Sequence, residues 1–266
     1  MISETRRWAL GVGRWALSAD LHQYGPDLAR IHHEGFAELA GAAGPAIVRL
    51  LRAAGIRRGL VVDLGCGSGI LAKQLLSRGY DVHGVDASAA MIRIARRTAP
   101  GATFAAGNAV DIALPRCRAV VATGESITYL TAGARPAPQL ARHIRRVSRA
   151  LEPGGLLVFD AIVADPAQPL RYRTWRAAER WAVLTESHED VRRRIVTRRI
   201  TTFLRSRSGY RRAHERHRVG VYRREQIVGL LEAAGFRTRV LRGYGAASLA
   251  PRRLVFVARL RAAAAS

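Results

Sequence analysis

Short apolar runs alternate with helically spaced apolar positions along residues 45–160. The apolar runs predict buried strands, and apolar residues three and four positions apart predict amphipathic helices. The predicted strands lie at residues 59–63, 80–86, 103–104, 119–123 and 155–160, and the predicted helices at 45–54, 70–76, 88–99 and 140–151. Such alternation predicts βαβ units, a parallel sheet and helices on both of its faces.

The pattern changes after Asp160. Residues 181–221 are rich in Thr, Val, Ile, Tyr, Phe and Arg, with turn signals at residues 188–190 and 206–209, and they predict three antiparallel strands. A helix at 227–234 and closing strands at 236–241 and 254–258 follow. We therefore expect an α/β fold with a doubly wound, mostly parallel, seven-stranded sheet and an antiparallel β insertion after the fifth strand.

The charge of the chain is strongly positive and carried almost entirely by arginine. Lysine and arginine number 44 against 20 acidic residues, a formal net charge of +24, and Lys73 is the one lysine. Residues 171–224 hold 17 arginines and five acidic residues. Three explanations stay open for this region: a solvated outer face, which we favour, a clamp for an anionic small substrate, or an RNA-binding face.

Cysteine content and hydropathy place the chain in a broad class. Cys66 and Cys117 are the two cysteines, with no disulfide or zinc spacing, and we expect a cytoplasmic protein without a metal site. No apolar stretch is long enough to span a membrane. Trp8, Val12 and Trp15 share one helical stripe, which predicts either an interfacial membrane helix or, preferably, a lid or packing helix.

A glycine-rich turn follows the first predicted strand. Gly65, Gly67 and Gly69 are spaced two apart, whereas the dinucleotide fingerprint would need a third glycine where Ile70 stands. Asp63 adds a carboxylate beside this turn, and a pyrophosphate would be repelled by it. A ligand with a cationic amine and no phosphate is compatible with that charge, and S-adenosylmethionine is such a ligand.

Three segments carry a family resemblance: Val61–Gly69, Gly84–Asp86 and Leu151–Gly155. As a set they resemble the class I S-adenosylmethionine-dependent methyltransferases, over roughly residues 45–160. The resemblance implies a Rossmann-like fold, S-adenosyl-L-methionine as cofactor and S-adenosyl-L-homocysteine as product. The cofactor-binding residues that it implies here are Asp63, Gly65, Cys66, Gly67 and Gly69 near the methionine part, Asp86 at the ribose, and Ala87 and Met91 against the adenine.

The loops after the next two strands complete the expected site. Gly107, Asn108 and Ala109 occupy the position that contacts the adenine amine in the family, where an aspartate is common; an amide oxygen can accept the same hydrogen bond. Gly124 is expected at the cofactor. Glu125 is the leading candidate to orient or deprotonate the acceptor, against the alternative that it contacts only cofactor or a backbone turn.

The segment from Tyr24 to Phe36 resembles the N-terminal lid of small-molecule members of the family. Tyr24 and Arg30 are expected to close over the methionine end of the cofactor. His32 or His33 could serve as a base, because imidazole titrates near neutrality, although two adjacent residues of a helix cannot both face inward. His188, His214 and His217 in the insertion are weaker candidates for substrate contact.

The interpretation is a methyltransferase acting by direct displacement on N or O of a small molecule. The placement of the insertion is similar to that in the glycine and amino-sugar N-methyltransferases, which favours N. The alternatives are an RNA methyltransferase using the Arg-rich insertion, and a non-catalytic cofactor-binding regulator. We expect a small-molecule acceptor as partner, no membrane and a monomer or homodimer. The expected units are a helical lid at 1–40, the cofactor-binding core at 41–164, the substrate-side insertion at 165–222, a C-terminal helix with closing strands at 223–260, and a tail at 261–266.

Overall fold

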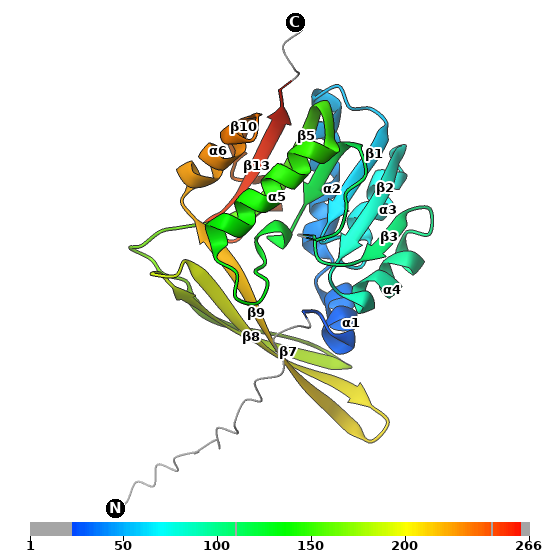
Figure 1. Cartoon of the computed structure of the whole chain (residues 1–266). Coiled ribbons are helices and arrows are strands. Elements are labelled where there is room, and N and C mark those ends of the chain that lie inside the picture. The colour runs from blue at the N-terminus through cyan, green and yellow to red at the C-terminus, as the bar shows by residue number, and fades with distance from the viewer. Residues whose placement is uncertain (1–22, 110, 246, 262–266) are drawn as a thin grey trace, which may run out of the picture.

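The computed structural model describes residues 23–109, 111–245 and 247–261 and has an α/β core with a second sheet beside it (Figure 1). The expected stripe of Trp8, Val12 and Trp15 and most of the C-terminal tail lie outside these residues. The helices are α1 Pro26–Gly35, α2 Glu38–Ala53, α3 Ile70–Leu76, α4 Ala89–Thr98, the short η1 Ser126–Thr128, α5 Pro136–Ala150 and α6 Arg224–Ala233.

Seven strands form the core sheet. In sequence order they are β1 Gly59–Leu64, β2 Tyr80–Asp86, β3 Thr103–Ala106, β4 Cys117–Ala122, β5 Leu151–Val163, β10 Phe236–Leu241 and β13 Arg253–Leu260. Their order across the sheet is β3-β2-β1-β4-β5-β13-β10, with the first five parallel and the last two antiparallel to their neighbours. The expected doubly wound, mostly parallel sheet is confirmed.

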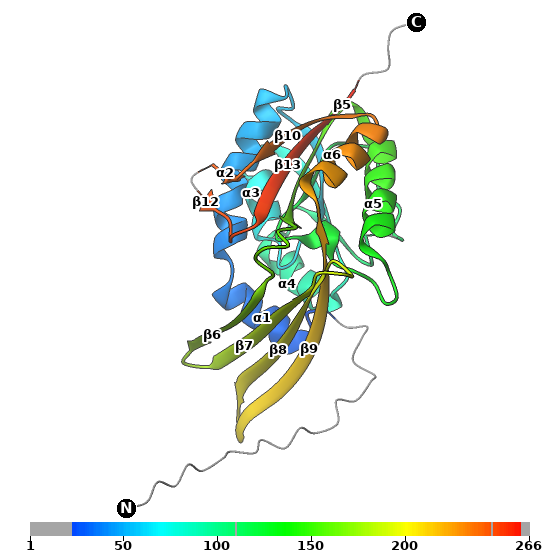
Figure 2. The ribbon, with the colours of Figure 1, turned by 90° about the vertical axis from the view of Figure 1, so that its left-hand side faces the viewer.

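Consecutive apolar residues of the strands face opposite helix layers. Val62 and Leu157 pack with α5 and α6, whereas their neighbours Val61 and Val158 pack with α2 and α3. The two layers lie on opposite sides of the sheet in Figure 2. Burial on both faces explains why these strands are continuous apolar runs rather than alternating ones.

Helix α2 is longer than predicted because it continues through a proline. The sequence predicts a helix from Pro45, but α2 begins at Glu38 and Pro45 lies inside it. A proline removes one backbone donor, which leaves the carbonyl four residues earlier without its helical partner. That carbonyl belongs to Gly41, and Nε2 of Gln74 on α3 donates to it at 3.0 Å. A side chain from the neighbouring helix thus replaces the lost bond.

The insertion after β5 is an antiparallel sheet of four strands, not three. They are β6 Arg171–Ala178, β7 Trp181–Asp190, β8 Ile195–Ser206 and β9 Gly209–Tyr222. The prediction misses β6 because all of its residues are exposed, so it has no alternation of buried and exposed positions. The turn expected at residues 188–190 is also misplaced: these residues end β7, and the turn follows them.

A short strand pairing and packing against α1 are two of the links that join the insertion sheet to the core. Strand β9 runs parallel to β5 at Ile162 and Val163, so the two sheets are continuous. Leu28 and Ile31 of α1 pack against Trp181 and Ile200 of the insertion. In Figure 2 helix α1 lies between the core and the strands β6–β9. The carboxyl ends of the parallel strands therefore face α1 and one side of the insertion.

Candidate active site

The glycine turn between β1 and α3 has the tight backbone that its sequence requires. Gly65, Gly67 and Gly69 all have positive φ, at 71°, 52° and 80°. The backbone N–H groups of Gly65 and Cys66 donate to the Val85 carbonyl at 2.7 and 3.1 Å, which fixes the turn against β2. A Cβ atom on Gly65 would lie 2.2 Å from Cβ of Ser126, so a glycine is needed there for space as well as for conformation.

Asp63 is a buried carboxylate at the end of β1. It is 1% exposed, and neither of its oxygens has a hydrogen-bond partner among the described residues. Burial, with a smaller effect from the charge of Asp86, raises the pKa of Asp63 to about 7. An unpaired buried carboxylate is costly, so this arrangement favours a bound cationic group beside the glycine turn.

Asp86 ends β2 on the other side of the same turn. One of its oxygens accepts from the Gly67 N–H at 2.9 Å and the other from the Ser88 N–H at 2.8 Å. Burial raises its pKa, while these two backbone hydrogen bonds lower it. The carboxylate is thus held rigidly at the strand end and retains lone pairs that ribose hydroxyls could use.

Two residues expected at the adenine lie at the start of α4. Ser88 caps this helix as predicted, with its Oγ accepting from the Met91 N–H at 3.1 Å. Met91 is buried and packs with Ala29 of α1 and Ala90. Ala87 is exposed. These positions are adjacent to Asp86, but Met91 also supports the lid helix, which the sequence does not indicate.

The loop after β3 lies beside Asp86. The Gly107 N–H donates to the Asp86 carbonyl at 2.9 Å, and the Asn108 carbonyl accepts from the N–H groups of Asp111 and Ile112. Ala109 is half-buried against the core. The structure therefore brings residues 107–109 to the same end of the sheet as Asp63, Asp86 and the glycine turn.

Gly124 and Glu125 follow β4 and are fixed by Asp160 of β5. Their backbone N–H groups donate to the two oxygens of Asp160 at 2.8 and 3.0 Å, and Glu125 has a positive φ of 64°. The Tyr244 hydroxyl also donates to Asp160, at 2.8 Å. The loop is thereby held beside the glycine turn, where Ser126 Oγ donates to the Leu64 carbonyl at 2.7 Å.

The side chain of Glu125 is engaged by two arginines. Arg198 Nη1 of the insertion lies 2.7 Å from Glu125 Oε2, and Arg253 Nη2 of β13 contacts Oε1. Arg253 also lies 3.6 Å from Asp160. The Glu125 side chain thus bridges the core and the insertion, and its expected role at the acceptor stays a prediction.

Tyr24 connects the lid to both the core and the insertion. Its carbonyl accepts from Ser88 Oγ at 2.6 Å, and its N–H donates to Glu215 Oε2 of β9 at 2.7 Å. Its hydroxyl lies 3.3 Å from the Tyr129 hydroxyl. Tyr24 is therefore connected to Asp86 through a single intervening residue, Ser88.

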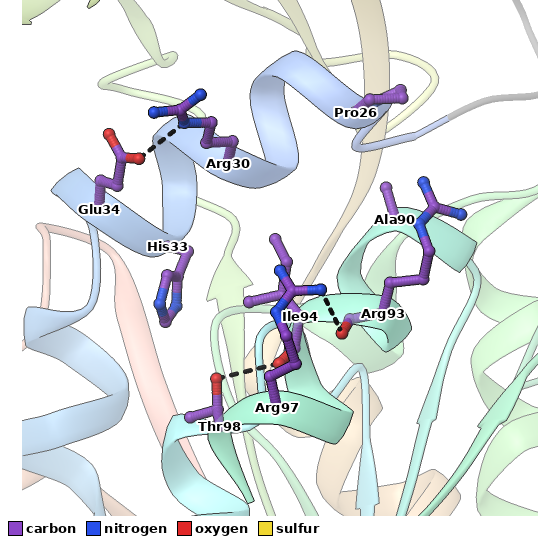
Figure 3. A pocket seen from close by; sticks show the side chains of 9 residues that line it. All are labelled: Pro26, Arg30, His33, Glu34, Ala90, Arg93, Ile94, Arg97 and Thr98. Atoms are coloured by element: carbon purple, nitrogen blue, oxygen red, sulfur yellow. Dashed lines mark hydrogen bonds and ion pairs between the residues drawn. The ribbon is translucent and has the colours of Figure 1, made fainter. Parts of the chain in front are cut away.

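His32 and His33 point to different places. The His32 ring packs edge-on to Tyr24, with centroids 5.1 Å apart, and stacks on Phe36. Burial, followed by the charges of His217 and His33, lowers the pKa of His32 to about 4. His33 instead lines a groove of about 570 Å³ between α1 and α4 (Figure 3).

Arg30 lies in the same groove as His33, away from the glycine turn. It pairs with Glu34 at 2.8 Å, and both side chains are exposed. Arg93 and Arg97 of α4 complete a basic rim (Figure 3). The structure thus does not bring Arg30 or His33 together with Tyr24, His32 and the glycine turn.

The insertion supplies site residues that the motifs do not reveal. Glu215 and His217 alternate on β9, so both face the lid, and Arg198 is opposite His217 in the register of β8 and β9. Tyr129 contacts the His217 ring with centroids 5.7 Å apart. In the sequence, Glu215 and His217 could be recognised only as polar residues two positions apart on a predicted strand. That spacing does not show which face of the strand is buried. Within the described residues no group of three His, Cys, Asp or Glu side chains could hold a metal ion.

The chain is similar to known methyltransferases in sequence and in fold. Residues 61–155 match the family described as a methyltransferase domain. Trans-aconitate 2-methyltransferase of Rhodopseudomonas palustris (strain BisB18) is 36% identical over 99 residues, which are 36% of this chain and 36% of that protein. The match therefore spans about a third of the length of this curated relative.

Solved structures resemble the whole described fold. The sugar N-methyltransferase KedS8 from Streptoalloteichus is 22% identical with a TM-score of 0.73, covering 90% of this chain and 95% of that one. SAM-bound CalS10, an amino pentose methyltransferase from Micromonospora echinaspora, is 20% identical with a TM-score of 0.69, covering 90% of this chain and 98% of that one. The domain match and the fold together confirm the resemblance to the class I S-adenosylmethionine-dependent methyltransferases.

Proposed function

We propose that this protein is an S-adenosylmethionine-dependent methyltransferase whose acceptor is a nitrogen or oxygen of a small molecule. The observation that carries the proposal is the buried Asp63 carboxylate, which has no partner in the described part of the chain and lies beside a glycine turn that a side chain would fill. Rigid Asp86 on the next strand completes a site for a ligand with a cationic amine and a ribose.

The residues present fit this cofactor. We assign the ammonium group of the methionine part to Asp63, the backbone of that part to the turn at Gly65–Gly69, and the ribose hydroxyls to Asp86. Asn108 can accept from the adenine amine, as the resemblance suggests. When bound, S-adenosylmethionine supplies an electrophilic methyl group on a sulfonium. The residues of the chain bind the cofactor and the acceptor, orient them toward each other and exclude water.

The insertion and α1 form the acceptor side of this proposed site. Arg211 of β9 pairs with Asp27 of α1, and Arg176 of β6 pairs with Glu38 of α2 at 2.7 Å, so ion pairs connect the insertion to both of these helices. A third arginine, Arg198, forms an ion pair with Glu125. Several arginines of the basic region thus have intramolecular partners, which supports a small acceptor over RNA as the ligand of the inner face.

The names of the relatives support the same substrate class. The relatives described above act, by their names, on trans-aconitate, on a sugar and on an amino pentose. We extend to this chain only what these relatives have in common, a small organic acceptor. We favour an amine acceptor because the insertion is placed along the chain as in the glycine and amino-sugar N-methyltransferases.

None of the described helices is both long enough and apolar enough to cross a bilayer.

The test is product formation. Purified protein is incubated with S-adenosylmethionine and, in separate reactions, amino sugars, their hydroxyl analogues, and di- and tricarboxylic acids, and S-adenosylhomocysteine is quantified by mass spectrometry. The proposal expects acceptor-dependent product with one class and loss of product in Asp63→Asn. Acceptor-dependent product with bulk RNA, and with none of the small molecules, would contradict the small-molecule acceptor.

A further inference from the structure

A buried imidazole on the insertion has one nitrogen with no partner. His217 of β9 is 0% exposed, and its Nδ1 makes no hydrogen bond to any residue that the structure describes. Its Nε2 lies 2.8 Å from Oε2 of Glu215. Buried polar atoms are normally satisfied, so an orphaned nitrogen at this depth calls for a ligand.

The tautomer follows from the partners of Glu215. This carboxylate already accepts the N–H of Tyr24 at 2.7 Å and of Gly25 at 2.9 Å, at the start of α1. An ionised carboxylate has no proton to donate, so Nε2 of His217 must carry the proton and donate it to Glu215. In the neutral ring Nδ1 is then the acceptor, with its lone pair unused.

Two tyrosines place this nitrogen beside the proposed cofactor site. The His217 ring centroid lies 5.0 Å from that of Tyr24, which bonds through its carbonyl to Ser88 next to Asp86, and 5.7 Å from that of Tyr129. Tyr129 follows η1, whose Ser126 contacts the end of β1. His217 thus lies near the segments that follow β2 and β4.

The titratable and charged neighbours of His217 come from several elements. Glu215 faces His217 from its own strand, and Arg198 is opposite it on β8. His32 of α1 interacts electrostatically with His217, and Tyr24 and Tyr129 contact its ring. A carboxylate that orients an imidazole through one nitrogen and leaves the other free to accept is the arrangement that general bases use.

We propose that His217, oriented by Glu215, accepts the proton of the methyl-receiving atom, and that the acceptors are amines or hydroxyls that carry such a proton. The inference rests on the proposed function. The bond from acceptor atom to methyl carbon forms, the carbon–sulfur bond of the sulfonium breaks with its electron pair staying on sulfur, and the acceptor's proton passes to Nδ1 of His217. Glu215 is a positioning residue in this step.

The variant His217→Gln separates this role from a structural one. The amide nitrogen of glutamine can still donate to Glu215 in place of Nε2, and its amide oxygen can accept a hydrogen bond but cannot take up a proton near neutral pH as Nδ1 does. The matched control is His214→Gln, since His214 is on the same strand but is exposed and faces away from the lid. Unfolding curves verify that both variants fold, and calorimetry with S-adenosylhomocysteine verifies that each retains the cofactor site.

The first readout needs no acceptor. Nitrogen-15 spectra of histidine-labelled protein report the tautomer of His217, and the proposal expects Nε2–H with unprotonated Nδ1 at neutral pH. In Glu215→Gln the nitrogen signal of His217 Nε2 should shift, because its hydrogen-bond acceptor changes from a carboxylate to an amide oxygen. A proton on Nδ1 of the neutral ring, or no change in Glu215→Gln, overturns the proposal.

The second readout is turnover with 3-amino-3-deoxy-D-glucose as the amine probe and D-glucose as its hydroxyl counterpart. His217→Gln should lower kcat by about 100-fold to 10,000-fold with little change in KM, and should remove the acidic limb of the pH profile, while His214→Gln matches the wild type. An unchanged kcat overturns the proposal. If neither probe is methylated, the tautomer of His217 and its response to Glu215→Gln decide the proposal. Absent S-adenosylhomocysteine binding in the wild type would contradict the proposed function instead.

Discussion

The guanidinium of Arg198 on the insertion lies 2.7 Å from the carboxylate of Glu125 on the core, and both side chains are largely buried, at 13% and 2% exposed. Because Arg253 of β13 contacts the same carboxylate, one side chain joins the loop after β4 to β8 and β13. This contact explains how a basic insertion is held over the carboxyl edge of the sheet. It also gives Glu125 a bridging role that the sequence does not predict.

Replacing Glu125 by Gln should destabilise the protein. The substitution leaves the buried Arg198 without its counter-charge and leaves Arg253 with Asp160 alone, and breaking a buried pair in this way costs about 3–5 kcal/mol. Urea denaturation measures the change. The control is Glu152→Gln, whose partner Arg118 forms an exposed pair at 3.0 Å and which should cost about 0–1 kcal/mol. Equal stabilities for the two variants would refute the bridging role.

Asp63 should make cofactor binding depend on pH. Its pKa in the free protein is raised to about 7, and a bound ammonium group favours the ionised form. Below pH 7 binding must first remove a proton, so the Kd for S-adenosylhomocysteine should increase by about tenfold for each unit that the pH falls. Calorimetry in two buffers of different ionisation enthalpy would detect the released proton at pH 6. Asp63→Asn should bind weakly and without this dependence.

The same residue should lower the stability of the free protein at neutral pH. A pKa raised from 3.8 to about 7 means that the folded state binds more protons than the unfolded state between these values, so stability falls as pH rises through that window. Asp63→Asn removes this cost and should be more stable above pH 7, by an amount on the order of 4 kcal/mol. The difference should vanish near pH 4. A variant that is less stable than the wild type at pH 8 would contradict the buried, unpaired carboxylate.

The glycine turn should tolerate no side chain at Gly65. Alanine there combines a left-handed backbone with a Cβ atom 2.2 Å from that of Ser126, and the expected cost is roughly 2–5 kcal/mol together with loss of S-adenosylhomocysteine binding. Gly79 has a similar φ of 85°, but a Cβ atom there would have no described atom within 4 Å. Gly79→Ala should therefore cost only about 1–2 kcal/mol and bind normally.

His32 should contribute to acid sensitivity. Its pKa is lowered from 6.5 to about 4, so the unfolded state takes up a proton that the folded state does not, and stability falls as pH drops from 6.5 toward 4. His32→Phe keeps an aromatic ring beside Tyr24 and Phe36. Between pH 6.5 and 4 its free energy of unfolding should fall by roughly 2–3 kcal/mol less than that of the wild type. The control is His188→Phe, since His188 is exposed. Parallel pH curves for the wild type and His32→Phe would be incompatible with this account.

The core fold could be predicted because its strands are buried on both faces. Runs such as Val61–Val62 and Leu156–Phe159 are typical of a parallel sheet between helix layers. The glycine spacing and the strand-end positions of Asp63 and Asp86 likewise placed the cofactor side, since parallel strands bring their carboxyl ends to one edge.

The acceptor side could not be predicted in the same way. Strand β6 is exposed throughout, so no periodicity marks it, and the arginines that contact Glu125 come from segments 73 and 128 residues away. The tyrosine rings beside His217, those of Tyr24 and Tyr129, precede α1 and follow η1. The pairing of Arg198 with Glu125 depends on the register of β8 and β9 and on how the insertion docks. Neither follows from local pattern, because only tertiary packing decides which face of an antiparallel strand is covered.

The central claim is that Asp86 and the glycine turn form a site for S-adenosylmethionine, and calorimetric titration with S-adenosylhomocysteine tests it most directly. The wild type should bind at micromolar concentration, Asp86→Ala should lose binding, and Asp81→Ala, an exposed position on the same strand, should bind as the wild type does. NAD should give no heat. Folded wild-type protein that does not bind, or Asp86→Ala that binds equally well, would contradict the account.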